Sequence, residues 1–95
     1  MIKHIVLFKL KDSSPESIER TAGVLRDMEG KIEQLRSIEV GIDVVKSPRS
    51  YDIALVTTFD SLEDLQGYQV HPVHKKVIEH MAEARESQVA VDFEF

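Results

Sequence analysis

The chain has 95 residues, a length that fits one domain, and its 12 Lys and Arg against 17 Asp and Glu give a formal charge of −5 at pH 7. This balance argues against a nucleic-acid or anionic-membrane partner, and the absence of cysteine excludes disulfides, thiolate nucleophiles and cysteine-type zinc sites. No segment resembles a signal peptide or reaches the ~20 apolar residues of a membrane span, so we expect a single soluble domain, residues 1–95, in the cytoplasm.

Residues 2–10 (IKHIVLFKL) predict the first strand, because β-branched and aromatic residues dominate the segment. Side chains alternate between the two faces of a strand. One face therefore carries Ile2, His4, Val6, Phe8 and Leu10, and the other carries Lys3, Ile5, Leu7 and Lys9. Both faces are apolar at the centre, so this strand needs cover on both sides.

Ser14-Pro15-Glu16 is a typical helix start, with Ser as the N-cap and Pro at the first helical position. Apolar residues then recur at steps of three and four, which predicts one long amphipathic helix with a kink or fraying at Gly30. Its buried stripe consists of Ile18, Ala22, Leu25, Met28, Ile32 and Leu35.

Two further strands are predicted at residues 38–45 and 51–59, separated by the turn residues 46–49. Ser61 caps a second helix, which we expect to break near His71-Pro72 because Pro disfavours helical geometry in the residue before it. Pro72 then begins a new helical segment. Residues 88–95 (QVAVDFEF) alternate as a final strand.

The predicted order is β-α-β-β-α-β, the split βαβ of ferredoxin-like α+β folds. It gives an antiparallel four-stranded sheet with the first and third strands central and all helices on one face. The opposite face would expose an apolar patch of Ile5, Leu7, Ala54 and Val56, which monomers rarely tolerate. We therefore expect a homodimer that packs sheet against sheet as a dimeric α/β barrel of eight strands.

Histidine and tyrosine cluster at residues 67–74, which contain Tyr68, His71 and His74. These side chains exchange protons or hydrogen bonds with substrates near neutral pH. If the His4 face of the first strand is turned toward the helices, His4 meets Tyr68 and His74 in a cavity. The alternative is structural: His4 as a hydrogen-bonded core histidine, His71 as a helix cap and Tyr68 as a core aromatic.

His71 and His74 are three residues apart and His80 follows, but no HExxH pattern or matching carboxylate completes a metal site. We expect no metal and no cofactor. The scattered glycines form no phosphate-binding loop, no G-x-S-x-G elbow is present, and the third strand lacks the basic-aromatic signature of RNA-recognition modules.

The chain resembles the stress-responsive A/B barrel domain family, a dimeric α/β-barrel group that includes plant heat-stable proteins and polyketide cyclases. The resemblance runs from end to end, and its most specific part is residues 68–74 (YQVHPVH). The other matching segments are residues 3–12 (KHIVLFKLKD), 39–41 (EVG), 51–56 (YDIALV), 59–61 (FDS) and 91–93 (VDF).

In cyclase members of this family, a histidine on the second helical region is the general base of an intramolecular aldol condensation, and a preceding tyrosine holds the substrate carbonyl. The resemblance implies these catalytic roles for His74 and Tyr68, and a pocket-lining role for His4. We expect His71, Phe8 and Ile53 to complete the binding pocket. Ile53 stands where the plant pocket has another histidine, and residues 21–28 contain no tyrosine, so this pocket is less polar.

Three functions remain open on the sequence. The first is a homodimeric barrel of the stress-responsive type with a small apolar ligand pocket in each subunit and no assigned reaction. The second is a cyclase-like or isomerase-like enzyme that acts on a small carbonyl compound with His74 as base. The third is an interaction module without a ligand. An open cavity beside Tyr68 and His74 would favour a ligand over the third function.

Overall fold

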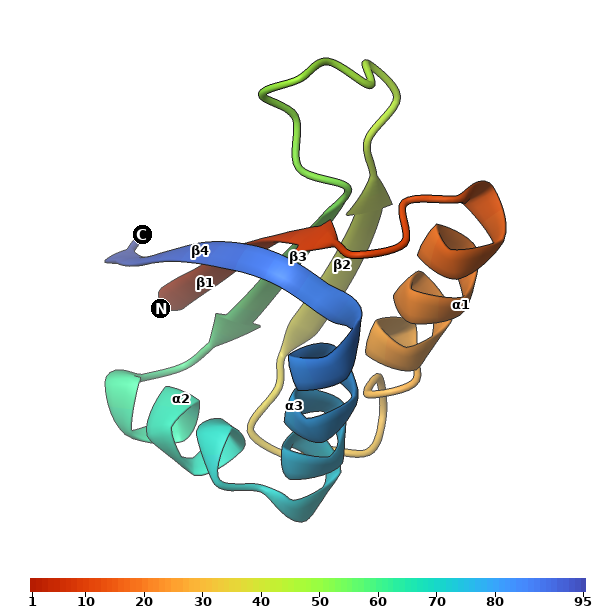
Figure 1. Cartoon of the computed structure of the whole chain (residues 1–95). Coiled ribbons are helices and arrows are strands. Elements are labelled where there is room, and N and C mark those ends of the chain that lie inside the picture. Colours follow the sequence, from red (N-terminus) through yellow and green to blue (C-terminus); the bar gives the residue numbers. More distant parts are fainter.

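The computed structural model describes residues 1–95, and Figure 1 shows its seven elements. In chain order they are β1 (Ile2–Leu10), α1 (Pro15–Arg26), β2 (Ser37–Ile42), β3 (Ile53–Phe59), α2 (Leu62–Gln69), α3 (Pro72–Ala84) and β4 (Arg85–Glu94). The strands form one antiparallel sheet in the order β2-β3-β1-β4. The predicted ferredoxin-like fold with β1 and β3 at the centre is confirmed.

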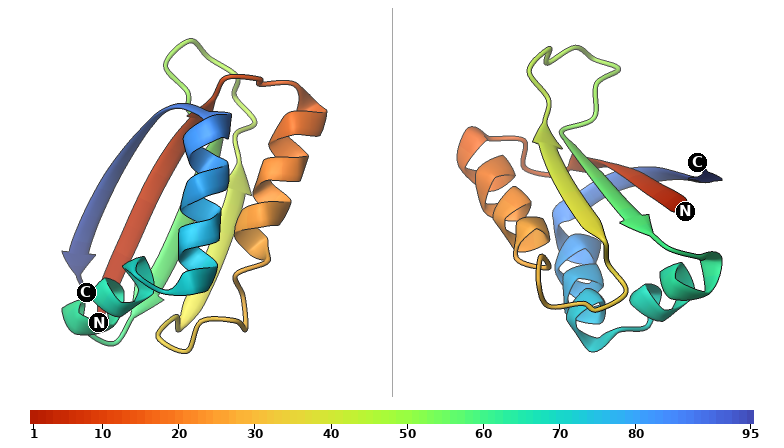
Figure 2. Two further views of the ribbon diagram at one scale, coloured as in Figure 1. Left: turned by 60° about the horizontal axis from the view of Figure 1, so that its bottom comes forward. Right: turned by 180° about the vertical axis from the view of Figure 1, so that it is seen from behind.

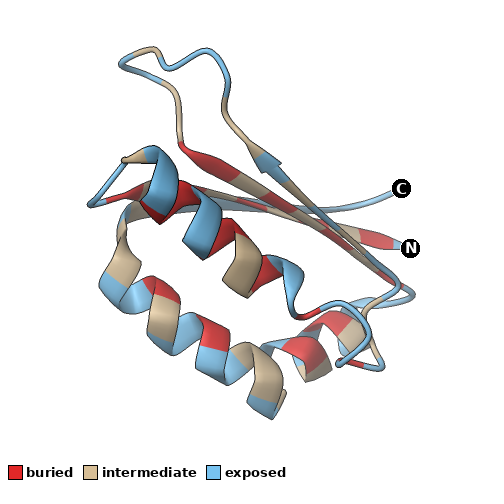
Figure 3. Ribbon diagram, turned by 90° about the vertical axis from the view of Figure 1, so that its right-hand side faces the viewer, coloured by how far each residue is buried: buried red, intermediate tan, exposed pale blue.

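All three helices lie on one face of the sheet, and the other face is uncovered (Figure 2). Burial alternates along β1 and β3, and the buried side chains of both strands face the helices. Figure 3 shows the same pattern on the helices, where buried and exposed positions alternate along each ribbon. The core is the layer between helices and sheet, and it contains Phe8, Leu25, Leu55, Phe59 and Tyr68 among its 16 apolar residues. None of the helices is long and apolar enough to span a bilayer.

The helix starts follow the sequence signals. Ser14 Oγ accepts a hydrogen bond from the Ser17 amide at 3.3 Å, and Ser61 Oγ accepts one from the Asp64 amide at 3.1 Å. These bonds satisfy backbone donors that a helix leaves free in its first turn. The predicted break at His71-Pro72 is confirmed, because α2 ends at Gln69 and α3 begins at Pro72.

The predicted length of the first helix is wrong. α1 ends at Arg26 rather than reaching Leu35, yet Met28 and Ile32 are still buried. The reason is a series of turns whose amides bond to the carbonyl three residues earlier: Met28 to Leu25, Glu29 to Arg26, Lys31 to Met28 and Leu35 to Ile32. Such turns repeat about every three residues, so the apolar stripe continues after the helix has ended. Gly30 has φ of 78°, a left-handed conformation that interrupts a helix.

The strand boundaries also differ from those predicted. β2 ends at Ile42 instead of Val45, and β3 begins at Ile53 instead of Tyr51, which leaves a projecting loop at residues 43–52 (Figure 1). β4 begins at Arg85, three residues before the predicted start. It starts there because α3 runs directly into it without a connecting loop.

We call the sheet surface turned away from the helices the open face. Its side chains come from Lys3, Ile5 and Leu7 of β1, Ala54, Val56 and Thr58 of β3, Val89, Val91 and Phe93 of β4, and Ser37, Glu39 and Gly41 of β2. Strand pairing aligns Val91, Ile5 and Val56 in one row across three strands. The open face is thus apolar over β4, β1 and β3, and Val91 is 54% exposed.

Candidate functional site

A cavity of about 500 Å³ lies between the helices and the part of the sheet formed by β1 and β4. Its apolar wall consists of Val6, Phe8, Leu25, Leu55, Val77, Ile78, Met81 and Ala90. Its polar side chains are His4 of β1, Gln69 of α2, His74 of α3, and Arg85, Gln88 and Asp92 of β4. The cavity therefore combines an apolar wall with two imidazoles, the arrangement expected of a small-molecule site.

His4 is held by a carboxylate from the neighbouring strand. The antiparallel register places His4 directly opposite Asp92, and the His4 Nδ1 atom hydrogen-bonds the Asp92 Oδ1 atom. The His4 side chain is only 10% exposed. Because a carboxylate only accepts hydrogen bonds, Nδ1 is the protonated nitrogen, and Nε2 carries the lone pair when the ring is neutral.

His74 lies in the first turn of α3, where its Nδ1 atom is 3.3 Å from the carbonyl oxygen of Gln69. A carbonyl only accepts, so Nδ1 is again the donor and Nε2 is free. Burial lowers the pKa of His74 below its ordinary value of 6.5; the charges of His4 and His71 act in the same direction, and the Gln69 bond opposes them. His74 is therefore a neutral base at neutral pH.

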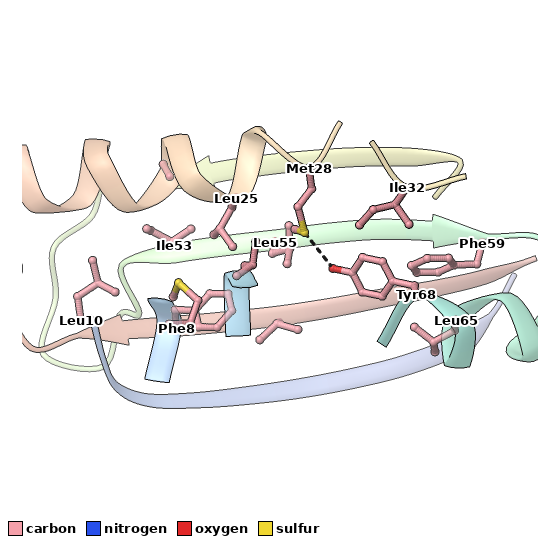
Figure 4. Packing of buried hydrophobic residues seen from close by; sticks show 14 of the residues in the cluster. Phe8, Leu10, Leu25, Met28, Ile32, Ile53, Leu55, Phe59, Leu65 and Tyr68 are labelled. Atoms are coloured by element: carbon pink, nitrogen blue, oxygen red, sulfur yellow. Dashed lines mark hydrogen bonds between the residues drawn. The ribbon is translucent and has the colours of Figure 1, made fainter. Parts of the chain in front are cut away.

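Tyr68 supports the His74 ring from the core side. The two rings are tilted by 31° with centroids 4.1 Å apart, and the Phe59 ring packs against Tyr68 at 4.9 Å. The Tyr68 hydroxyl donates to Met28 Sδ at 3.7 Å (Figure 4), and burial raises the pKa of this phenol above its ordinary value. Tyr68 does not line the cavity. A role for its hydroxyl in holding a carbonyl stays a prediction, and it would require the ring to move away from Met28.

Of the three other residues predicted to line the pocket, one lines the cavity, one caps a helix and one lies in the core. Phe8 lines the cavity beside His4 and His74. His71 instead caps α3, because its Nδ1 atom accepts a hydrogen bond from the Val73 amide at 3.1 Å. Ile53 is 1% exposed at the start of β3 and belongs to the core rather than to the cavity lining.

Sequence reasoning missed the polar residues that β4 and α2 contribute, namely Gln69, Arg85, Gln88 and Asp92. The alternation in residues 88–95 places Gln88 and Asp92 on one face, but it does not show what that face meets. Asp92 contacts His4 across 88 residues of sequence, and only the strand register reveals this contact. No group of three or more His, Cys, Asp or Glu side chains is arranged to hold a metal ion.

The lowered pKa of His74 makes a pH-dependent contribution to stability. The unfolded histidine has the ordinary pKa, so it takes up a proton that the folded side chain resists, and this favours unfolding as the pH falls. Relative to His74→Asn, whose amide replaces the Nδ1 donor, wild-type protein should lose free energy of unfolding below about pH 6.5 and show a constant difference above about pH 7.5. Urea unfolding at one protein concentration measures this difference. A difference that is constant down to pH 5 would show that His74 titrates normally.

Comparison with known proteins bears on the whole chain. An uncharacterized protein of Streptomyces coelicolor is 36% identical over 98 residues, which cover 100% of both sequences. A dimeric protein of unknown function with a ferredoxin-like fold from Bacteroides fragilis is 37% identical, with a TM-score of 0.82 over 99% of this chain and 95% of that one. A dimeric ferredoxin-like protein of unknown function from Thermobifida fusca is 29% identical, with a TM-score of 0.86 over 99% and 90%.

A family model also matches the chain, in agreement with its fold and its relatives. The family model described as the stress responsive A/B barrel domain matches residues 2–95. This range includes every element of the sheet and all the residues that line the cavity. The chain therefore belongs to the stress responsive A/B barrel domain family.

Proposed function

We propose that the protein is a homodimer joined through its open face, and that each subunit binds a small ligand with an apolar body and a carbonyl group in the cavity. The observation that carries this proposal is the composition of the cavity lining. The apolar wall suits a hydrocarbon or aromatic body, while His4 and His74 offer polar contacts to a carbonyl compound. A cytoplasmic location stays a prediction from composition.

The dimer is supported by the open face and by the relatives. The helices cover only one face of the sheet (Figure 2). The row of Val91, Ile5 and Val56 therefore faces water in a single subunit. A second copy offers an identical apolar sheet, and two such sheets bury each other in a symmetric interface. The similar structures from Bacteroides fragilis and Thermobifida fusca are both dimeric.

A second candidate function is a general-base enzyme, favoured by the state of His74. Its free Nε2 atom could take a proton from a carbon next to a carbonyl, leaving the electron pair on the carbonyl oxygen as an enolate. If the enolate is conjugated with a double bond, return of the proton from His74 Nε2 to the far carbon gives an isomerisation. Attack of the enolate carbon on a second carbonyl of the same molecule forms a carbon–carbon bond and an alkoxide, and the alkoxide takes the proton back from His74 Nε2, which completes a cyclisation. Burial keeps His74 neutral and ready to accept this proton.

A ligand screen with small aromatic and carbonyl-containing acids, read by thermal shift and native mass spectrometry, tests the proposal. A ligand at 100 times its Kd should stabilise the protein by about 2.7 kcal/mol. We expect His74→Ala to weaken binding about tenfold, the loss of roughly 1.4 kcal/mol of hydrogen bonding. If the protein is an enzyme, the same variant should lose turnover by a factor of about 10² to 10⁴.

His80→Ala is the matched control, because His80 lies on the same helix but outside the cavity. It should bind ligands as the wild type does. Equal turnover in His74→Ala and wild type would reject His74 as the base. A complete lack of binding across the screen would favour the interaction module that binds no ligand.

A further inference from the structure

We infer that the cavity is specific for a monocarboxylate, and that Arg85 binds the carboxylate group of the ligand. This inference rests on the proposed function, because it names the chemical class of the molecule that the same cavity would hold. It follows from where the backbone places Arg85, from the charges around it and from the shape of a guanidinium.

An irregularity in β4 turns Arg85 toward the cavity. Lys9 pairs with Ser87 and Leu10 pairs with Arg85, so Glu86 is an extra residue without a partner on β1. In a regular strand Arg85 would share a face with Ser87 and point to the open face. The bulge instead puts Arg85 opposite Leu10, on the helix side of the sheet, where it lines the cavity. Bulges re-aim side chains in this way beside functional sites.

The positive charge of Arg85 has no protein partner. Asp92 is the one carboxylate of the cavity lining, and it is engaged by His4. The ion pairs of the structure join His4 to Asp92, Arg26 to Glu19 and Arg36 to Asp60, and none includes Arg85. A cation that borders an apolar wall without a counter-charge favours an anionic ligand, which would supply that charge.

The lining favours a carboxylate over a phosphate. A guanidinium presents its N–H groups as a fork that matches the two oxygens of a carboxylate. Arg85 is the single Arg or Lys of the lining, so a doubly charged phosphate monoester would leave one charge uncompensated. Eight of the other lining residues are apolar, and the cavity has a volume of about 500 Å³. The fitting ligand is thus a small acid with an aromatic or aliphatic body.

A carboxylic acid and its amide have nearly the same shape, and only the acid is charged at neutral pH. Comparing the affinities of the two therefore measures the contribution of the negative charge to binding. We suggest cinnamate with cinnamamide and hexanoate with hexanamide, titrated at pH 7.5 and followed by calorimetry and NMR shifts. Wild-type protein should bind each acid at least tenfold more tightly than its amide. Arg85→Gln should remove this preference and leave the affinity for the amide unchanged, and Arg85→Lys should keep part of it.

Arg49→Gln is the matched control, because Arg49 is an exposed arginine in the loop of residues 43–52 and does not line the cavity. It should bind both members of each pair as wild type does. Equal affinity of wild type for acid and amide overturns the carboxylate inference but leaves the ligand cavity in place. An unchanged preference in Arg85→Gln overturns the role of Arg85. Binding of neither member overturns the proposed ligand cavity as well.

Discussion

Val56→Lys is expected to convert the dimer into a folded monomer. Val56 lies at the middle of β3 on the open face, in the row that includes Ile5 and Val91. A symmetric interface buries the new charge twice, once from each subunit, and the one carboxylate beside position 56 is Glu39, its pairing partner on β2. Removing even a paired charge from water costs several kcal/mol, so the dimer dissociation constant should still rise at least about 100-fold, or roughly 2.7 kcal/mol.

Size-exclusion chromatography with light scattering, run over a range of concentrations, measures this change. The variant should keep its circular dichroism spectrum, because position 56 lies outside the core that the helices cover. Glu79→Lys is the control, since Glu79 is an exposed residue of α3 on the helix side of the sheet. A dimeric Val56→Lys, or a wild type that is monomeric at micromolar concentration, would contradict the open-face interface.

The order of strands and helices along the chain was predictable, because alternating side chains and turn residues are local signals. The final packing did not override them. The end of the first helix was not predictable. The apolar spacing that continues through Met28 and Ile32 is produced equally by a helix and by successive turns. Only the backbone hydrogen bonds distinguish the two. The sequence signal at Gly30 predicted a kink or fraying, whereas α1 already ends at Arg26 and Gly30 lies in the turns that follow it.

Part of the candidate site was also predictable from the sequence, and part was not. Alternation predicted which residues share a face of β1 with His4, but it did not predict whether that face meets the helices. The structure turns the His4 face toward the helices, so that His4 and His74 line one cavity. Asp92 was not predictable, because its contact with His4 depends on the register between two strands at opposite ends of the chain. The face of the sheet on which the Arg85 side chain lies depends on a bulge in β4, and no residue type in that segment predicts the bulge. The sequence therefore predicts which elements meet at the site better than it predicts the polar contacts between them.

Two substitutions at Tyr68 should have very different effects on stability. Tyr68 is fully buried and packs against both Phe59 and His74. Tyr68→Ala should therefore lower the free energy of unfolding by about 3–5 kcal/mol, as expected for removal of a core aromatic ring. Tyr68→Phe keeps the ring and loses only the weak hydroxyl contact with Met28 Sδ, so it should cost less than about 1 kcal/mol. Urea unfolding measures both values.

Ligand binding then decides what the hydroxyl of Tyr68 does. If the ring only positions His74, Tyr68→Phe should bind ligands within about threefold of wild type, because the stacked ring is retained. If the hydroxyl turns from Met28 to hold a substrate carbonyl, binding or turnover should fall at least tenfold while stability changes little. Tyr51→Phe controls for the loss of a hydroxyl elsewhere, since Tyr51 is the other tyrosine and lies outside the cavity. The phenylalanine variant thus separates a structural from a catalytic tyrosine without disturbing the core.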